Sequence, residues 1–259
     1  MTSLRLRDGT LDIAETGTGK PLILLHSLLA DRAIFDKIVP ALAKQRRVIV
    51  PDLPGFGGSS SAGSTIEGIA DRIADLFDAL DLKATDVLGN GFGGFIASTL
   101  AIRHGTKFDR LVLADTGVSF SPEGKQSFYA MAERVRQSGM EAIVDVALKR
   151  LFPEDFIALN PDIMTERRNA LVKTNPEFFA EACHALAALD LTAEIGKIRN
   201  PTLVVVGELD AATPPEMART LAKALPRAEL IEMPGCGHAP MAQAPEAFIK
   251  AVAQFLDLK

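Results

Sequence analysis

The stretch at residues 87–94 constrains the fold of this chain more than any other. An apolar run that ends at Leu88 meets a cluster of glycines, and a helical pattern over residues 95–101 begins at once. The chain must therefore pass from a strand through a very tight turn directly into a helix. Residues without a Cβ allow the helix to pack close behind such a turn.

The glycine spacing matches the nucleophile elbow, G-x-S-x-G, except at its centre. The elbow carries its serine on a strained turn between a strand and a helix. Here Gly89 and Gly93 occupy the two outer positions, and Gly91 stands where the serine is expected. Because glycine has no side chain, residue 91 cannot attack a substrate. The sequence therefore predicts the frame of a serine hydrolase without its usual nucleophile.

A dinucleotide-binding turn is the alternative interpretation of these glycines, since Gly89-x-Gly91-x-x-Gly94 fits the pattern G-x-G-x-x-G. That motif normally follows the first strand of its unit, with an acidic residue about 20 positions further on. Several apolar runs precede the glycines here. Asp109 and Asp115 lie downstream, but neither ends a clear second strand of such a unit. We favour the elbow and predict no cofactor.

Composition and charge exclude several classes of function. With 259 residues, 47% of them hydrophobic and 24% charged, the chain can bury a large core. A net charge of −5 argues against nucleic acid or an anionic membrane as a partner. Two cysteines form neither a disulfide framework nor a C-x-x-C pair. No apolar run resembles a secretion signal or a membrane span, so we expect a cytoplasmic protein of undetermined oligomeric state.

Strand and helix patterns alternate along most of the chain. Continuous apolar runs are typical of strands buried on both faces of a parallel sheet, and the alternation predicts helices on both of its faces. Eight strands are expected, at residues 3–7, 11–15, 21–25, 48–50, 85–88, 111–114, 201–206 and 228–233. Helices are expected at residues 32–45, 65–80, 95–101, 215–225 and 245–257.

The alternation stops between residues 119 and 194. This stretch carries helical patterns and no strand pattern, and its prolines at positions 153, 161 and 176 fall at expected helix boundaries. We therefore predict a helical cap at 119–194, inserted into an α/β core formed by residues 1–118 and 195–259.

Two residues after the late strands complete a catalytic pattern. Asp210 follows the strand ending at residue 206, and His238 follows the strand ending near residue 233. Where an elbow is present, the acid and the histidine come after it in this order. A carboxylate fixes the tautomer of the imidazole, which then takes a proton from a nucleophile or a water. Singly, each could be an ordinary turn residue; together with the elbow they are predicted as acid and base.

Backbone groups of the same frame are predicted to form an oxyanion hole. In this arrangement one N–H follows the nucleophile position and another comes from the loop after an early strand. The corresponding residues are Phe92 and, in the turn at residues 26–28, Leu28. Backbone donors survive any change of side chain, so the site can still polarise a carbonyl.

The chain resembles α/β-hydrolases over its whole length, through the elbow, the turn at residues 52–59 and the loops bearing Asp210 and His238. Within that superfamily it is most similar to 3-oxoadipate enol-lactonases, through His26-Ser27-Leu28 and the segments 110–116, 183–190 and 210–215. It departs from them at Gly91 and in having no Trp. The resemblance implies an α/β-hydrolase fold and a small, carboxylate-bearing lactone or ester as substrate.

Five further residues are candidates for the site. Ser27, Arg150 and His184 are candidates for substrate contact, although a solvated or helix-packing role is the alternative for the two cap residues. Asp115 follows a strand and is a possible alternative acid, but it is more typical of a strand-end turn. Cys236 is a conceivable substitute nucleophile, but it lies on the loop of the predicted base rather than at the elbow.

Three hypotheses follow from Gly91. Removal of a serine nucleophile costs on the order of 10⁶ in kcat, which excludes the usual acyl-enzyme route through residue 91. The first hypothesis is a hydrolase of a small ester or enol-lactone whose serine has been replaced. The second is a natural enzyme in which His238 and Asp210 activate a water or deprotonate the substrate. The third is a ligand-binding protein that keeps the cavity. None of the three requires a metal or an organic cofactor.

Overall fold

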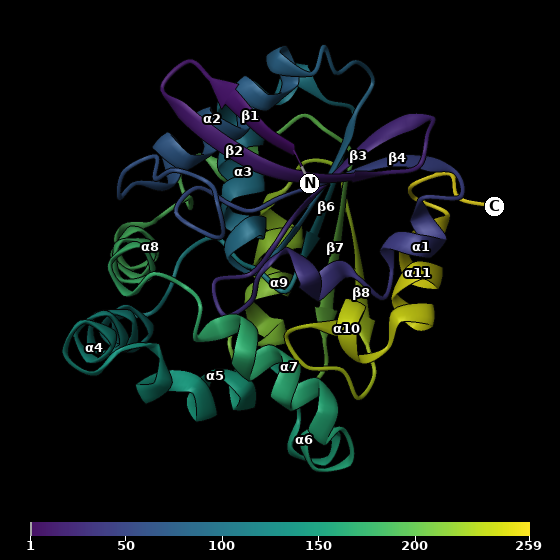
Figure 1. The fold of residues 1–259 in the computed structure, drawn as a ribbon. Coiled ribbons are helices and arrows are strands. Elements are labelled where there is room, and N and C mark those ends of the chain that lie inside the picture. Colours follow the sequence, from purple (N-terminus) through teal and green to yellow (C-terminus); the bar gives the residue numbers. More distant parts are fainter. Residues whose placement is uncertain (1) are drawn as a thin grey trace.

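The computed structural model describes residues 2–259, and its centre is a sheet of eight strands (Figure 1). The order in the sheet is β1-β2-β4-β3-β5-β6-β7-β8. Strand β2 pairs antiparallel with β1 and β4, and the other neighbours pair parallel. The predicted fold class is therefore confirmed. The strands are β1 (Thr2–Leu6), β2 (Gly9–Thr16), β3 (Lys20–Leu25), β4 (Arg46–Pro51), β5 (Asp86–Asn90), β6 (Arg110–Ala114), β7 (Thr202–Gly207) and β8 (Ala228–Met233).

Helices flank the sheet on both sides, with α2 and α3 on one side and α1 and α11 on the other (Figure 1). The α-helices are α1 (Val39–Leu42), α2 (Ile66–Ala79), α3 (Phe92–His104), α4 (Pro122–Ser138), α5 (Val144–Leu151), α6 (Glu154–Leu159), α7 (Pro161–Leu171), α8 (Pro176–Ala188), α9 (Pro215–Ala224), α10 (Pro240–Gln243) and α11 (Pro245–Ala253). Short 3₁₀ turns are η1 (Arg32–Phe35), η2 (Gly105–Lys107), η3 (Met140–Ile143) and η4 (Ile195–Lys197).

The central strands are apolar because helices cover both of their faces. All five residues of β5 and all six of β7 are buried. Strand β2, nearer the edge, alternates buried and more exposed residues over its middle. Continuous apolar runs therefore mark the centre of the sheet, and alternating runs mark its edge.

The segment between β6 and β7 holds only helices, α4 to α8, and lies to one side of the sheet (Figure 1). Helices α4 and α8 pack against each other, and a bridge between Ser119 and Asp190 joins the two ends of the segment. We call residues 119–194 the helical insertion. Its action as a cap stays a prediction.

One predicted helix is wrong. The single helix expected at residues 32–45 is instead the 3₁₀ turn η1 followed by the four-residue helix α1. Pro40 explains the break, because it has no N–H to continue a helix and disfavours the helical conformation of the residue before it. It is tolerated in the first turn of α1, where no intrahelical donor is needed.

None of the helices described within residues 2–259 combines the length and apolar character that a bilayer crossing requires.

The elbow between β5 and α3 is built on glycine. Gly91 has φ +53° and ψ −114°, a conformation that side-chain-bearing residues rarely adopt. Gly93 lies so close to β3 that an added Cβ would stand 2.1 Å from the carbonyl oxygen of Leu25. The Gly93 N–H donates to the His26 carbonyl at 2.9 Å, which fixes the start of α3 against the loop after β3.

We expect Gly93→Ala to lower the free energy of unfolding by about 1–3 kcal/mol or more, because the obstructing atom is backbone and cannot move away cheaply. Urea denaturation followed by circular dichroism measures the change. Gly196→Ala is the matched control, since its added Cβ would meet no atom closer than 3.8 Å. Equal stability of the two variants would contradict this account of the elbow.

Candidate active site

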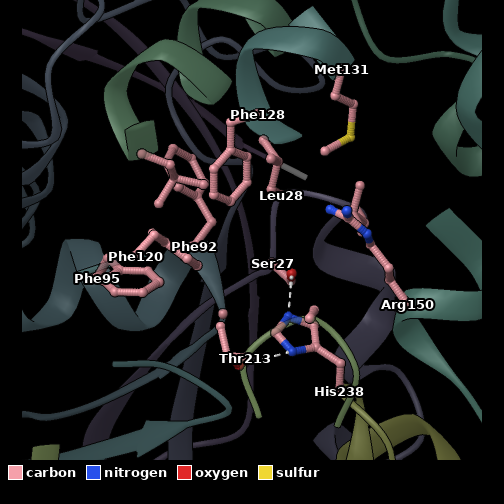
Figure 2. Close-up of a pocket in the computed structure, with 14 residues that line it drawn as sticks. Ser27, Leu28, Phe92, Phe95, Phe120, Phe128, Met131, Arg150, Thr213 and His238 are labelled. Carbon is pink, nitrogen blue, oxygen red and sulfur yellow. Dashed lines mark hydrogen bonds between the residues drawn. The ribbon is translucent and has the colours of Figure 1, made fainter. Parts of the chain in front are cut away.

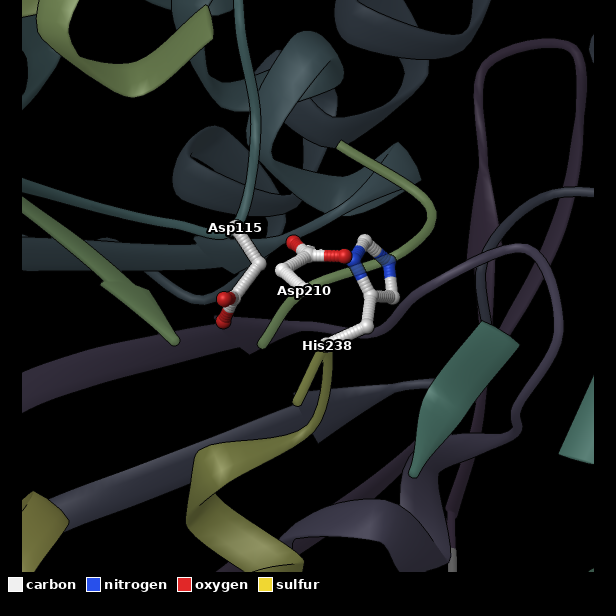
Figure 3. A group of neighbouring side chains, drawn as sticks. All are labelled: Asp115, Asp210 and His238. Carbon is white, nitrogen blue, oxygen red and sulfur yellow. Dashed lines mark hydrogen bonds and ion pairs between the residues drawn. The ribbon is translucent and has the colours of Figure 1, made fainter. Parts of the chain in front are cut away.

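His238 and Asp210 form a buried pair at the carboxyl edge of the sheet (Figure 3). The His238 Nδ1–H donates to Asp210 Oδ2 at 2.9 Å. The hydroxyl of Thr213 donates to the same oxygen at 2.7 Å, and Asp210 Oδ1 accepts the N–H groups of Ala212 and Thr213. Burial raises the pKa of Asp210, but the charge and hydrogen bond of His238 and the bonds from Thr213 outweigh it and hold that pKa below its usual value. Asp210 is therefore ionised.

Neighbouring parallel strands bring these residues together. Asp210 lies on the loop after β7, and His238 on the loop after β8. The Leu209 N–H donates to the Cys236 carbonyl at 2.8 Å, which ties the two loops to each other. The sequence indicates both loops, and the structure supplies the contact between them.

The second ring nitrogen of His238 is directed at the elbow. A Cβ added to Gly91 would lie 2.5 Å from His238 Nε2. The hydroxyl of Ser27, on the loop after β3, lies 3.1 Å from the same nitrogen (Figure 2). The base, the nucleophile position and Ser27 therefore converge on one point.

Asn90 and Asp115 support the pair from behind. Asn90 Nδ2 donates to the His238 carbonyl at 3.0 Å and to Asp115 Oδ2 at 3.2 Å, and the Gly207 N–H donates to Asp115 Oδ1. Burial, followed by the nearby charge of Asp210, raises the pKa of Asp115 well above its usual value. The pKa values of the two neighbouring carboxyl groups are therefore shifted in opposite directions. Asp210, and not Asp115, receives the His238 N–H.

The same three side chains are the cluster that could be considered for a metal. Ligand atoms of Asp115, Asp210 and His238 lie within 4.8 Å of one another. Each Asp115 oxygen already accepts a hydrogen bond, each Asp210 oxygen accepts two, and His238 Nδ1 donates to one of them. A cation would have to break this network. The arrangement is suited to holding and transferring a proton.

Leu28 and Phe92, the predicted oxyanion donors, both line the cavity beside Gly91. Within residues 2–259 neither backbone N–H donates to a protein acceptor. Phe92 is the first residue of α3, where an amide lacks an intrahelical partner and the helix dipole favours negative charge. The hydrogen bond from Gly93 to His26 holds the two loops side by side.

The cavity at this point is narrow, with a volume of about 40 Å³. Its polar side comes from the core loops. The helical insertion supplies an apolar wall of Phe120, Phe128, Met131 and Leu186, together with the guanidinium of Arg150 (Figure 2). The sequence indicated Arg150 as a candidate for substrate contact. It did not indicate the apolar wall, because apolar residues at helical spacing are also typical of ordinary helix packing.

Arg150 is a cation without a carboxylate partner. It donates to the hydroxyl of Ser127 at 2.6 Å and makes no ion pair within the described residues 2–259. Burial lowers its pKa. A partly buried positive charge at a cavity wall favours an anionic ligand, because a buried charge is costly without a partner.

The structure does not bring His184 and Cys236 into the cavity lining. The His184 ring packs beside Tyr129, and its Nε2 lies 3.2 Å from Arg136 Nη1. It faces other residues of the helical insertion, and its predicted contact with the substrate stays a prediction. Cys236 is buried on the loop of His238, and burial raises the pKa of its thiol, which makes it a poor nucleophile.

Comparison with known proteins identifies the class. A family model described as the alpha/beta hydrolase fold matches residues 20–245. The chain is 31% identical over 262 residues to a 2-hydroxymuconate semialdehyde hydrolase of Pseudomonas sp. (strain CF600), covering 95% of this chain and 89% of that protein. It is 25% identical over 236 residues to 3-oxoadipate enol-lactonase 1 of Acinetobacter baylyi, covering 91% and 88%.

Among solved structures, the enol-lactonase from Burkholderia xenovorans LB400 superposes with a TM-score of 0.93 at 30% identity, covering 99% of this chain and 100% of that one. The chain therefore belongs to the α/β-hydrolase family. The predicted resemblance to 3-oxoadipate enol-lactonases is confirmed, and the relatives named above are hydrolases.

His26 anchors the loop that carries Ser27. Its Nε2 accepts the Leu53 N–H at 3.1 Å, so its Nδ1 carries the hydrogen and donates to the Ser27 carbonyl at 2.9 Å. The ring is fully buried, and burial lowers its pKa from 6.5 to about 4. His26 is therefore a neutral structural residue.

We expect this burial to make the fold sensitive to acid. Between pH 6.5 and about 4 the unfolded chain binds a proton at residue 26 and the folded chain does not, so the free energy of unfolding falls as the pH falls. The shift corresponds to about 3 kcal/mol at about 1.4 kcal/mol per pKa unit. Urea denaturation across this range should show a shallower pH dependence for His26→Asn. An unchanged slope would contradict the assignment.

Proposed function

We propose that this protein hydrolyses a small carboxylic ester or enol-lactone, with His238 as general base and Asp210 as the carboxylate that orients it. The observation that carries the proposal is the Asp210–His238 hydrogen bond of 2.9 Å, whose far ring nitrogen faces the cavity at the elbow. Because Nδ1 holds the hydrogen, Nε2 holds the lone pair that accepts a proton.

The remaining groups fit acyl transfer. His238 Nε2 removes the proton from a hydroxyl nucleophile, and the attack places negative charge on the carbonyl oxygen of the substrate. The N–H groups of Leu28 and Phe92 are available for that oxygen, since no protein acceptor within residues 2–259 uses them. His238 then returns the proton to the leaving oxygen. The nucleophile cannot come from Gly91.

The cavity supports a small substrate with a carboxylate. Its narrow shape and its apolar wall suit a short aliphatic or small ring-shaped acyl group. The guanidinium of Arg150 lies on this wall and has no carboxylate partner within the described chain, so it is available to bind a carboxylate of the substrate. The similarity to enol-lactonases points to the same substrate class. In this proposal the helical insertion acts as a cap that forms one wall of the site.

We expect His238→Ala and Asp210→Asn each to lower kcat by three decades or more, for a short-chain aryl ester and for an enol-lactone. His238→Ala removes the general base, and Asp210→Asn removes the carboxylate that fixes the tautomer of that base. Spectrophotometric hydrolysis assays measure the loss. His104→Ala is the control, since His104 pairs with Asp71 on the outside of α3. Saturable binding of both compounds without any turnover would refute hydrolysis and favour a ligand-binding role.

Arg150→Met should raise KM for a carboxylate-bearing ester by about 10-fold to 100-fold, the range expected for one lost charge-assisted hydrogen bond. KM for the neutral methyl ester of the same compound should change little, because that ligand has no charge for Arg150 to meet. Lys149→Met, one position away and exposed, is the matched control. An equal effect on both esters would show that Arg150 supports packing rather than charge recognition.

A further inference from the structure

Ser27 occupies the hydrogen-bond position that a nucleophile needs. Its Oγ lies 3.1 Å from His238 Nε2, and a Cβ built on Gly91 would lie 2.7 Å from that same oxygen. The Ser27 hydroxyl therefore reaches into the space beside the empty elbow position. It is buried among protein atoms and lines the cavity (Figure 2).

The tautomer of His238, with its hydrogen on Nδ1, is the one that can accept a proton from Ser27. Nδ1 donates its hydrogen to Asp210, so Nε2 presents a lone pair and the Ser27 Oγ–H donates to it. Ser27, His238 and Asp210 thus form a continuous hydrogen-bonded chain from hydroxyl to carboxylate. This is the arrangement of a serine–histidine–aspartate triad, which is recognised by geometry rather than by position in the sequence.

The oxyanion donors suit attack from Ser27 as well. Leu28 directly follows Ser27, so its N–H has the relation to this serine that the Phe92 N–H has to residue 91. Both amides line the cavity and donate to no acceptor within residues 2–259. In this arrangement the loop after β3 supplies the nucleophile, Ser27, together with the Leu28 N–H. The elbow then supplies only a backbone donor, the Phe92 N–H.

The backbone of Ser27 is held in place, as a nucleophile requires. Its carbonyl accepts a hydrogen bond from His26 Nδ1 at 2.9 Å and one from the Ala30 N–H at 3.3 Å. His26 is in turn fixed by the Leu53 N–H. Such support reduces the cost of ordering the reacting group.

We propose that Ser27 is the nucleophile of this protein, in a triad moved from the elbow to the loop after β3. The proposal rests on the ester or lactone hydrolysis proposed above. Ser27 Oγ bonds to the carbonyl carbon, its proton passes to His238 Nε2, and the carbonyl electron pair moves to the oxygen. When the carbonyl re-forms, the bond to the alkoxy or enol oxygen breaks, and that oxygen takes the proton from His238.

The second half of the reaction regenerates the serine. A water attacks the carbonyl carbon of acyl-Ser27 and gives a proton to His238. The tetrahedral species then collapses, the bond to Ser27 Oγ breaks, and His238 returns the proton to that oxygen. The products are the carboxylic acid and free Ser27, so no oxidant, metal or further reactant is needed.

Covalent labelling tests the nucleophile without depending on turnover. The full chain, treated with an alkyl fluorophosphonate and digested, should carry one phosphonyl group on the peptide containing Ser27, as mapped by mass spectrometry. His238→Ala and Ser27→Ala should abolish the label. Ser138→Ala, at an exposed helix end outside the cavity, should retain it. Absence of label, or label on another residue, would overturn the assignment.

Kinetics separate a nucleophile from a residue that only positions His238. We expect a burst of about one equivalent of phenol from an activated aryl ester, and a loss of at least 1000-fold in kcat for Ser27→Ala. Ser27→Cys should still form an acyl-enzyme, detected by mass.

Two outcomes distinguish the proposals. If Ser27→Ala keeps a His238-dependent rate within about threefold of the unmodified chain, water is the nucleophile, and the Ser27 proposal fails while hydrolysis stands. If no ester or lactone is turned over but Ser27 is labelled in a His238-dependent way, the proposed hydrolysis fails and the nucleophile assignment stands.

Discussion

The close approach of α3 to the sheet is the constraint on which the rest of the site depends. A Cβ on Gly93 would stand 2.1 Å from the Leu25 carbonyl oxygen, so the elbow can sit against the loop after β3 only because that position has no side chain. This contact places the Phe92 amide beside Leu28 and Ser27. It also sets residue 91 opposite His238. This framework does not depend on a side chain at residue 91, because backbone atoms define it.

Two buried carboxyl groups lie side by side beneath the site, and their pKa values are shifted in opposite directions. Asp115 and Asp210 are neighbours in the interior, and burial, followed by the charge of Asp210, raises the pKa of Asp115. The hydrogen bonds from His238 and Thr213 keep Asp210 charged instead. The Asp210 carboxylate then fixes the tautomer of His238, which leaves Nε2 free to take a proton. The guanidinium of Arg150 lies on another wall of the same cavity.

The sequence predicted the order of strands and helices well. Strands that are buried on both faces appear as continuous apolar runs, and tight turns appear as clusters of glycine. It failed at residues 32–45, where helical periodicity hid the break at Pro40. Asp210 and His238 were recognisable because their place after late strands depends on chain order alone. Asn90 and Thr213 were missed as supporting residues, since their partners are remote in sequence and no local pattern marks such contacts.

The sequence by itself determined the α/β-hydrolase frame, the absence of a nucleophile at residue 91 and the two residues that could serve as acid and base. These follow from local pattern and order along one chain. Only the tertiary structure decided what stands beside His238 Nε2, because Ser27 and His238 lie 211 positions apart and meet through the pairing of distant strands. It also separated Arg150, which reaches the cavity, from His184, which does not. A side chain's direction depends on packing between elements, and sequence periodicity does not specify it.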